Sequence, residues 1–279
     1  MFLCYYSSMF RAVATIVGVL LVTTIAAAQT PLQAIVDREH AFARRALEVG
    51  VPQSFVEFMT DDAWAFAPDP VNAKKYWSAE KRDDSILEWA PNFADAASDG
   101  TLGYTTGNWQ LREKKGAEPS LFGEFNTIWV KQRDGSYKWV VDIGIGHDKP
   151  STYSTSVATP PLTGGRHPSP PSFDMQTFDE QARKDVQKAY ATFASSSIRM
   201  IRRGKMPILG AAAVKAELWG KITYGPVIAT QRASDMTYVL RPYTLGDEKG
   251  NELQVWKYDH QLAGWTIVLD VLRATGPKR

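Results

Sequence analysis

Cysteine is almost absent from the sequence, since Cys4 is the only one in 279 residues. It lies in an N-terminal segment that we predict below to be removed. Without it the chain has no thiol, which excludes disulfide bonds, thiolate catalysis and cysteine metal sites. Histidine is scarce too: the spacing of the four histidines matches no metal-binding motif. They are His40, His147, His167 and His260. We therefore expect no metal and no cofactor.

Motifs that would identify a reaction or a partner are also missing. The sequence has no glycine-rich phosphate loop, no serine-centred nucleophile elbow and no basic stripe interleaved with aromatic residues. Charge of neither sign dominates, because 32 Lys and Arg stand against 30 Asp and Glu, and 31 against 30 once Arg11 of the N-terminal segment is left out. This balance favours no polyanion, so we expect no nucleic-acid partner.

Long apolar runs are confined to residues 1–28. Arg11 is the only charged residue there, followed by the apolar run Ala12–Val22 and by Ala26–Ala28. This order predicts a signal peptide cleaved before Gln29. A membrane span needs about 20 apolar residues, more than this run supplies. We therefore expect a periplasmic or secreted protein that meets the membrane only through its signal peptide, before cleavage.

What the sequence does have is a break in composition near its middle. Residues 148–172 are rich in Pro, Gly, Ser and Thr and have little to bury, which is typical of an extended linker. The predicted organisation is a first domain at 29–147, the linker at 148–172 and a second domain at 173–279. Either half is long enough to bury its own core.

The two halves repeat one order of elements. Ala97–Leu102 is echoed by Ala233–Tyr238, and the strand, turn and strand of Ile128–Asp142 are answered by Val255–Asp270. Both longer segments carry a hairpin signal and end on an aspartate. Two matches in the same order favour an internal duplication.

Each half opens with an amphipathic helix. Apolar residues recur at helical spacing from Leu32 to Leu47 and again from Phe178 to Met200. Each helix must bury its stripe against the Tyr-, Trp- and Val-rich strands that follow. We therefore predict an α+β fold of two tandem cone-shaped domains, each a long helix packed in a curved antiparallel sheet that leaves a cavity at one end.

These strands resemble a known superfamily. Asp99–Gly107, Trp129–Gln132 and Asp134–Asp142 look like strand motifs of the nuclear transport factor 2-like superfamily, and more narrowly of its SnoaL-like and uncharacterised secreted branches. Pro70–Trp77 fits the segment that follows the helices there, so the resemblance covers residues 31–147.

The second half, 173–273, is similar through Ile198–Pro207 and Gly210–Val214, although it lacks the glycine pair Gly103 and Gly107. The resemblance implies the cystatin-like cone. It leaves the activity open, because the superfamily includes cyclases, dehydratases and isomerases beside non-catalytic binding and association modules.

Two carboxylates are candidate catalytic groups. Glu39 falls in the middle of the apolar stripe of the first helix, so it must be paired or face a cavity. In a cavity, burial would raise its pKa and suit it as a general base, whereas bonded to a tryptophan indole or an arginine it would be structural. Asp142 and Asp270 hold matching places in the last strands, and the resemblance implies that Asp142 could serve as the base. A strand-end aspartate that caps a neighbouring amide is the structural alternative.

Four aromatic residues are candidate ligand contacts in the first half. Trp64, Tyr104, Trp109 and Trp129 could line a pocket for a flat apolar molecule, although tryptophans in small α+β domains usually belong to the core.

Three hypotheses for function follow. The first is an exported protein that binds a small apolar molecule in its first domain. The second is a metal-free enzyme of cyclase, dehydratase or isomerase type, with Glu39 or Asp142 as base. The third is a non-catalytic interaction module, in which the two domains pair within one chain or the chain forms a homodimer.

Overall fold

The computed structural model describes residues 29–154, 156–160, 169–217 and 220–276. The predicted signal peptide, with Cys4, and the linker residue His167 lie outside these ranges. The first unit contains α1 (Pro31–Val49), α2 (Val51–Phe58), β1 (Met59–Phe66), β2 (Pro70–Asn72), α3 (Ala73–Ala79), β3 (Ile86–Ala96), β4 (Leu102–Arg112), β5 (Leu121–Lys131) and β6 (Tyr137–His147). The second unit contains α4 (Gln176–Lys184), α5 (Val186–Phe193), β7 (Ala194–Arg202), β8 (Ile208–Leu209), α6 (Ala211–Glu217), β9 (Ile222–Tyr224), β10 (Ala229–Arg232), β11 (Met236–Leu245), β12 (Glu248–Asp259) and β13 (Gly264–Ala274).

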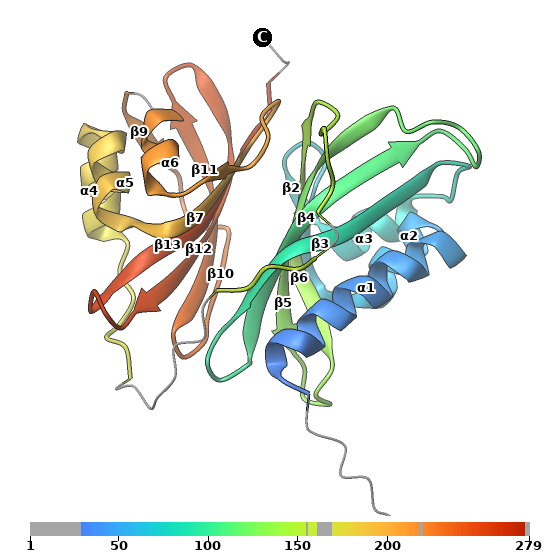
Figure 1. The fold of residues 1–279 in the computed structure, drawn as a ribbon, viewed down its shortest axis with the longest axis horizontal. Helices are drawn as coiled ribbons and strands as arrows, with labels where there is room; N and C mark the ends of the chain where they lie inside the picture. The colour runs from blue at the N-terminus through green and yellow to red at the C-terminus, as the bar shows by residue number, and fades with distance from the viewer. Residues whose placement is uncertain (1–28, 155, 161–168, 218–219, 277–279) are drawn as a thin grey trace, which may run out of the picture.

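Each unit is a sheet with helices on its outer face, and the two sheets face each other between the helices (Figure 1). The first sheet has the order β2-β1-β6-β5-β4-β3, and the second has β10-β11-β12-β13-β7-β8 with β9 beside β11. The predicted α+β fold class, repeated twice, is confirmed. One detail differs, because β1 pairs with β6 and β7 with β13 in parallel, so neither sheet is purely antiparallel.

The first helix forms where the sequence predicts it. Thr30 caps the N-terminus of α1 by accepting a hydrogen bond from the Gln33 amide, and Gly50 ends the helix with a φ of 91° that favours glycine. The buried face includes Ile35, Glu39 and Phe42. This face packs on β3 and β4, so the apolar stripe points at the concave side of the sheet.

The single helix predicted from Phe178 to Met200 is wrong. Asp185 is extended, and its side chain caps α5 by accepting from the Lys188 amide at 3.1 Å, so the helical run is divided into α4 and α5. Strand β7 then begins at Ala194, and Met200 pairs with Asp270 of β13. An N-cap residue inside an apolar stripe ends the preceding helix, because the capping residue itself does not adopt the helical conformation.

The two sheets share their register as well as their order. Thr127 pairs with Asp142 in the first sheet, and Gln254 pairs with Asp270 in the second. Both β5–β6 and β12–β13 have a register shift next to a tryptophan, Trp129 in one and Trp256 in the other. Positions of the two units can therefore be matched residue by residue from strand pairing.

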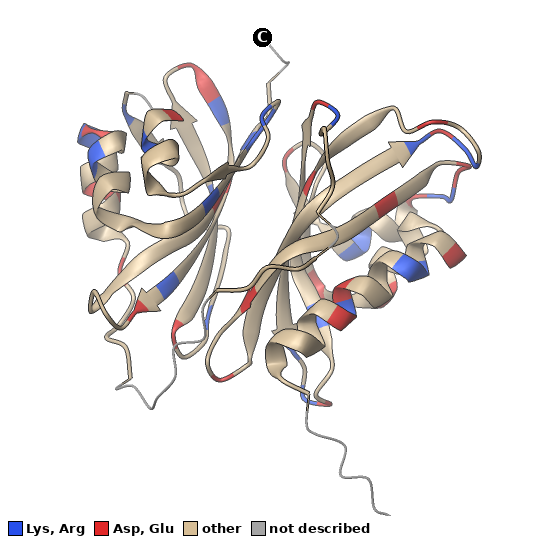
Figure 2. Ribbon diagram, in the orientation of Figure 1, with Lys and Arg blue, Asp and Glu red and all other residues tan. Residues whose placement is uncertain are grey.

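One hydrophobic cluster joins the two sheets. It combines Ile128, Val141 and Ile143 of the first unit with Leu253 and Leu269 of the second, all 1% exposed or less. Figure 2 shows that charged residues gather on the helices and at strand ends, while most of the facing strand surface carries none. Burial of this apolar surface is the main force that holds the sheets together.

The segments that repeat in sequence touch each other in space. The Ser98 amide donates to Asp235 at 2.8 Å, and in return the Ser234 amide donates to Asp99 at 3.0 Å. The hydroxyls of the two serines lie 2.8 Å apart. Such reciprocal contacts are the pattern of a two-fold interface between identical subunits, here made within one chain.

Part of the connecting segment 148–172 also bonds to the first sheet. Ala158 forms an isolated parallel bridge with Phe93, with the Ala94 amide donating to the Ala158 carbonyl at 3.1 Å. No helix in the described part of the chain is long and apolar enough to span a membrane.

Candidate functional site

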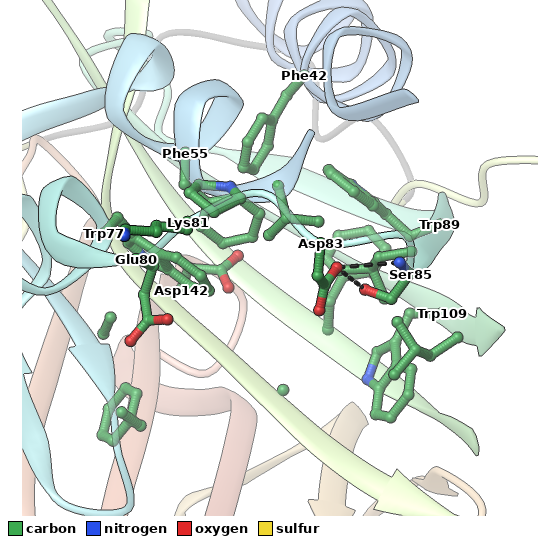
Figure 3. Close-up of a pocket in the computed structure, with 18 of the residues that line it drawn as sticks. Phe42, Phe55, Trp77, Glu80, Lys81, Asp83, Ser85, Trp89, Trp109 and Asp142 are labelled. Atoms are coloured by element: carbon green, nitrogen blue, oxygen red, sulfur yellow. Dashed lines mark hydrogen bonds between the residues drawn. The ribbon is translucent and has the colours of Figure 1, made fainter. Parts of the chain in front are cut away.

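The first unit holds a cavity of about 420 Å³ between its helices and the concave face of its sheet (Figure 3). Most of the lining is apolar or aromatic, and the exposed residues Glu80, Lys81 and Asp83 lie at its rim. The lining residues are Phe42, Val51, Pro52, Phe55, Ala65, Phe66, Trp77, Glu80, Lys81, Asp83, Ser85, Leu87, Trp89, Trp109, Leu111, Phe125, Asp142, Gly144 and Arg273. A cavity of this size and lining is suited to a small molecule.

Asp142 of β6 is the one carboxyl on the sheet wall of this cavity. Its Oδ2 atom accepts a hydrogen bond from the Thr127 hydroxyl at 2.8 Å. Burial raises its pKa to about 7; the Thr127 hydrogen bond acts against this rise, and the charge of Glu39 adds to it. The residue is only half-buried, and because it lines the cavity we take its remaining surface to face that space.

The indole ring of Trp109, on β4, packs against Gly123 of β5 and Gly144 of β6. A Cβ at Gly123 would come within 2.4 Å of the Trp109 ring, and one at Gly144 would lie 3.5 Å from its Nε1 atom. The close approach of the indole therefore requires glycine at position 123. Within the described structure this Nε1 atom is buried and has no acceptor, so the cavity wall contains an unused N–H donor near Gly144, two residues beyond Asp142.

Glu39 lies in the core and not in the cavity lining. It is fully buried and accepts hydrogen bonds from Trp89 Nε1 at 2.6 Å, from the Thr105 hydroxyl at 2.6 Å and from Trp129 Nε1 at 3.1 Å. Burial raises the pKa of this carboxyl, and the hydrogen bonds oppose the rise. This is the structural alternative that the sequence left open, with indoles as the partners.

The other three predicted ligand contacts lie away from the cavity. Trp129 is fully buried in the core, where it bonds to Glu39. Tyr104 and Trp64 belong to the opposite face of the sheet and pack in the cluster that joins the two units. Of the six candidate residues, the structure therefore brings Asp142 and Trp109 to the cavity.

Several lining residues escaped the sequence reading. Phe55 and Trp77 come from α2 and α3, and Gly144 follows Asp142 by two residues on the same face of β6. The period of two in a strand could have identified Gly144 once Asp142 was chosen. Arg273 could not have been found this way, because it belongs to β13 of the second unit; its guanidinium bonds to the Pro68 carbonyl and lies 5.5 Å from the centre of the Phe66 ring.

The matching region of the second unit is filled by side chains. By register, Leu272 stands where the first unit has Gly144, and Arg241 stands where it has Gly107. Arg241 bonds to Glu252 at 2.9 Å and to Asp179 at 2.8 Å, with its guanidinium 3.4 Å from the centre of the Tyr224 ring. A buried charge needs such partners to be tolerated.

Asp270, the counterpart of Asp142, is enclosed by the same network. The Tyr190 hydroxyl donates to its Oδ2 atom, and Gln254 donates to the same atom at 3.0 Å. Asp270 is fully buried, and burial raises its pKa to about 6. Both aspartates lie inside their strands and not at the strand ends that the sequence predicts, because β6 and β13 continue beyond them. They occupy opposite settings, one at an open cavity and one in a closed polar network.

Comparisons with known proteins concern the fold. A putative ketosteroid isomerase from Parabacteroides distasonis is 13% identical, with 39% of this chain and 84% of that chain covered and a TM-score of 0.31. Nuclear transport factor 2 from Cryptosporidium parvum is 12% identical, with 39% and 98% covered and a TM-score of 0.30. A nuclear transport factor 2-like superfamily protein from Salmonella enterica is 17% identical, with 38% and 87% covered and a TM-score of 0.29.

Each match covers about the length of one unit. The names of the Cryptosporidium and Salmonella proteins include nuclear transport factor 2. No protein-family model matches the sequence, and no curated protein matches it at the level that marks a relative.

Proposed function

We propose that the first unit binds a small, mainly apolar molecule in its cavity and holds it against Asp142. The observation that carries this proposal is a half-buried carboxyl, with a pKa raised to about 7, on the wall of a tryptophan-lined space of about 420 Å³. The matching carboxyl of the second unit, Asp270, already accepts hydrogen bonds from Tyr190 and Gln254. The first unit has a cavity where the second unit is filled by side chains, and this difference favours a binding role for the cavity of the first unit.

The test fills the cavity of the first unit with the side chain that stands at the matching position of the second unit. Gly144→Leu introduces the side chain found at the matching position, Leu272, and the first atom of that side chain meets only the Trp109 Nε1 atom at 3.5 Å. Native mass spectrometry of freshly purified protein should show a bound small molecule in the wild type and none in Gly144→Leu. Gly146→Ala, at an exposed position outside the lining, is the control and should keep the ligand. Equal occupancy in all three proteins would refute the proposal.

A second candidate function is a carboxylate-dependent enzyme of cyclase, dehydratase or isomerase type with Asp142 as general acid and base. A pKa of about 7 leaves both forms of the carboxyl populated near neutral pH, which is the condition for efficient proton transfer. If a substrate turned over by the wild type is found, Asp142→Asn should lower kcat by about 10² to 10⁴. Unchanged turnover in that variant would leave binding as the function.

Export is part of the same proposal. It is supported by the signal-peptide pattern of residues 1–28, with its apolar run and its alanines before Gln29. Cell fractionation should place the protein in the periplasm or the medium, and N-terminal sequencing of that material should begin at Gln29. A cytoplasmic protein that retains Met1 or Met9 would contradict it.

We propose that the pairing of the two sheets within one chain persists in solution, in place of a homodimer. Support comes from the shared apolar cluster and from the reciprocal bonds at Ser98 and Ser234. Small-angle scattering should then fit one compact monomer. A homodimer or an extended chain with separate units would refute it. Pairing within one chain is one of the two arrangements of the third hypothesis, and the same buried faces favour it over a homodimer.

A further inference from the structure

Helices α2 and α5 hold equivalent places in the two units. Each has eight residues and runs directly into the strand that pairs in parallel with β6 or β13. Met59 pairs with Trp139 at the start of one such strand, and Ala194 pairs with Ile267 at the start of the other. The fifth residue of each helix therefore matches: it is Phe55 in the first unit and Tyr190 in the second.

In the second unit this tyrosine is the partner of Asp270, the aspartate that matches Asp142. Tyr190 is fully buried, and its hydroxyl donates to Asp270 Oδ2. The phenol ring packs at the edge of Phe178, 5.5 Å between ring centres. A phenol with its hydroxyl on a carboxylate and its ring among aromatic side chains thus occupies this position.

In the first unit the ring is present and the hydroxyl is not. Phe55 and Asp142 line the same cavity, Phe55 from helix α2 and Asp142 from strand β6 (Figure 3). Throughout the described residues, Thr127 is the only side chain that donates to Asp142. A carboxylate accepts several hydrogen bonds, so Asp142 retains acceptor capacity toward the cavity. The charged groups that face this setting are Glu39 on the buried face of α1 and Glu80, Lys81, Asp83 and Arg273 in the lining.

We infer that the ligand of the first unit is a ring-bearing alcohol of the phenol type, whose hydroxyl donates to Asp142 as that of Tyr190 donates to Asp270. The inference rests on the proposed function and names the ligand class for that site. When Asp142 is ionised, a ketone, an ether or a hydrocarbon of the same shape has no proton to donate to it and leaves the carboxylate desolvated without a new partner. The second unit carries, in Tyr190, a built-in counterpart of the ligand.

The experiment compares two probes of nearly equal shape on the full-length mature protein. Binding of 2-naphthol, a donor, and of 2-methoxynaphthalene, which cannot donate, is followed by fluorescence titration at pH 8. A hydrogen bond to a charged acceptor predicts that 2-naphthol binds at least about tenfold more tightly. In Asp142→Asn the difference should shrink to a few-fold, because the acceptor is no longer charged.

Two variants test the internal counterpart. Phe55→Tyr places a hydroxyl opposite Asp142 and should weaken 2-naphthol by about tenfold or more, because the protein then supplies the donor itself. Tyr190→Phe, the matched change in the second unit, should leave both probe affinities unchanged. Near-ultraviolet circular dichroism confirms that each variant is folded before titration.

The outcomes separate the two proposals. Equal binding of both probes to the wild type overturns the phenol inference and leaves an apolar binding cavity in place. Absence of binding by either probe, together with no molecule retained on purification, counts against the proposed function itself. Because the comparison of the two probes is made on the wild-type protein, it does not depend on any variant folding.

Discussion

The two units have one architecture and opposite interiors. At matched positions the first has Gly107, Gly144 and Phe55 where the second has Arg241, Leu272 and Tyr190. These differences toward larger or more polar side chains accompany the replacement of a cavity by a packed polar network. The difference teaches that the register of the sheet fixes where a site can lie, while a few side chains decide whether it is open.

The same comparison shows what the second unit contributes to the first. Its sheet covers the face of the first sheet that is turned away from helices α1–α3, and Arg273 reaches the edge of the cavity. A filled unit can still support an open one, because packing between the units needs only the sheet face without helices. The following predictions are ordered from the largest expected effect to the smallest.

Removal of the buried cation of the second unit should be the most damaging change. Arg241→Met leaves Glu252, which is fully buried, without its charged partner, and a broken buried ion pair costs about 3–5 kcal/mol. Urea denaturation should show this loss. Lys74→Met, which removes the exposed ion pair with Asp61, is the control and should leave the midpoint in place. Equal midpoints for both variants would mean that the network adds nothing to stability.

Opening the filled unit should cost somewhat less. Leu272→Ala deletes a side chain that is 1% exposed and packed among aromatic residues, for a loss of about 2–5 kcal/mol through lost burial and the space left behind. The reciprocal change, Gly144→Leu, should alter the free energy of unfolding by much less, because the cavity receives the side chain. Equal losses of stability in Leu272→Ala and Gly144→Leu would contradict the contrast between a filled second unit and an open first unit.

The raised pKa of Asp142 predicts a slope of stability with pH. The folded carboxyl, with a pKa of about 7, binds a proton more tightly than the unfolded one, which titrates near the ordinary pKa of an aspartate, 3.8. The folded state therefore holds more protons between about pH 4 and pH 7, and stability from this group falls as pH rises through that window. Asp142→Asn should stabilise the protein more at pH 8 than at pH 5, measured by denaturation at both.

Thr127→Val tests the same pH dependence of stability through the hydrogen-bond partner of Asp142. Loss of the hydroxyl that bonds to the ionised carboxyl should move the pKa of Asp142 further upward and shift the window to higher pH. A stability curve with the same pH dependence in wild type, Asp142→Asn and Thr127→Val would contradict the assignment of the slope to this carboxyl.

The contact between the repeated loops should give the smallest effect. Ser98→Ala and Ser234→Ala each remove one hydroxyl of a bonded pair, for about 1 kcal/mol or less. Because the two hydroxyls bond to each other, the double variant should lose less than the sum of the single losses. Strict additivity in this cycle would show that the two loops act independently.

Much of the fold could be predicted from local pattern. The stripe that begins at Leu32 predicts α1, and the two hairpin segments with matching aspartates identify the repeat. The division of α4 from α5 was missed, because the stripe continues across Asp185 while the cap stops the helix. An N-cap residue within an apolar stripe changes the direction of the backbone, while the spacing of apolar residues on either side stays the same.

The candidate site was only partly predictable, for a reason visible in β4. Residues 102–107 are all buried, since one face is covered by helices and the other by the second sheet. No alternation of polar and apolar residues then distinguishes the faces. Tyr104 and Trp109 were therefore equal candidates, although they point to opposite sides of the sheet.

The sequence by itself determined the α+β class, the first helix, the duplication and the presence of one aspartate at the same place in each half, because these depend on neighbours along the chain. Only the tertiary structure decided that Glu39 is held by two indoles and a hydroxyl, that Asp142 meets a cavity while Asp270 meets Tyr190, and that Arg273 crosses from one unit to the other. Those outcomes depend on which faces of the sheets become covered, and that is set by contacts between segments far apart in the chain.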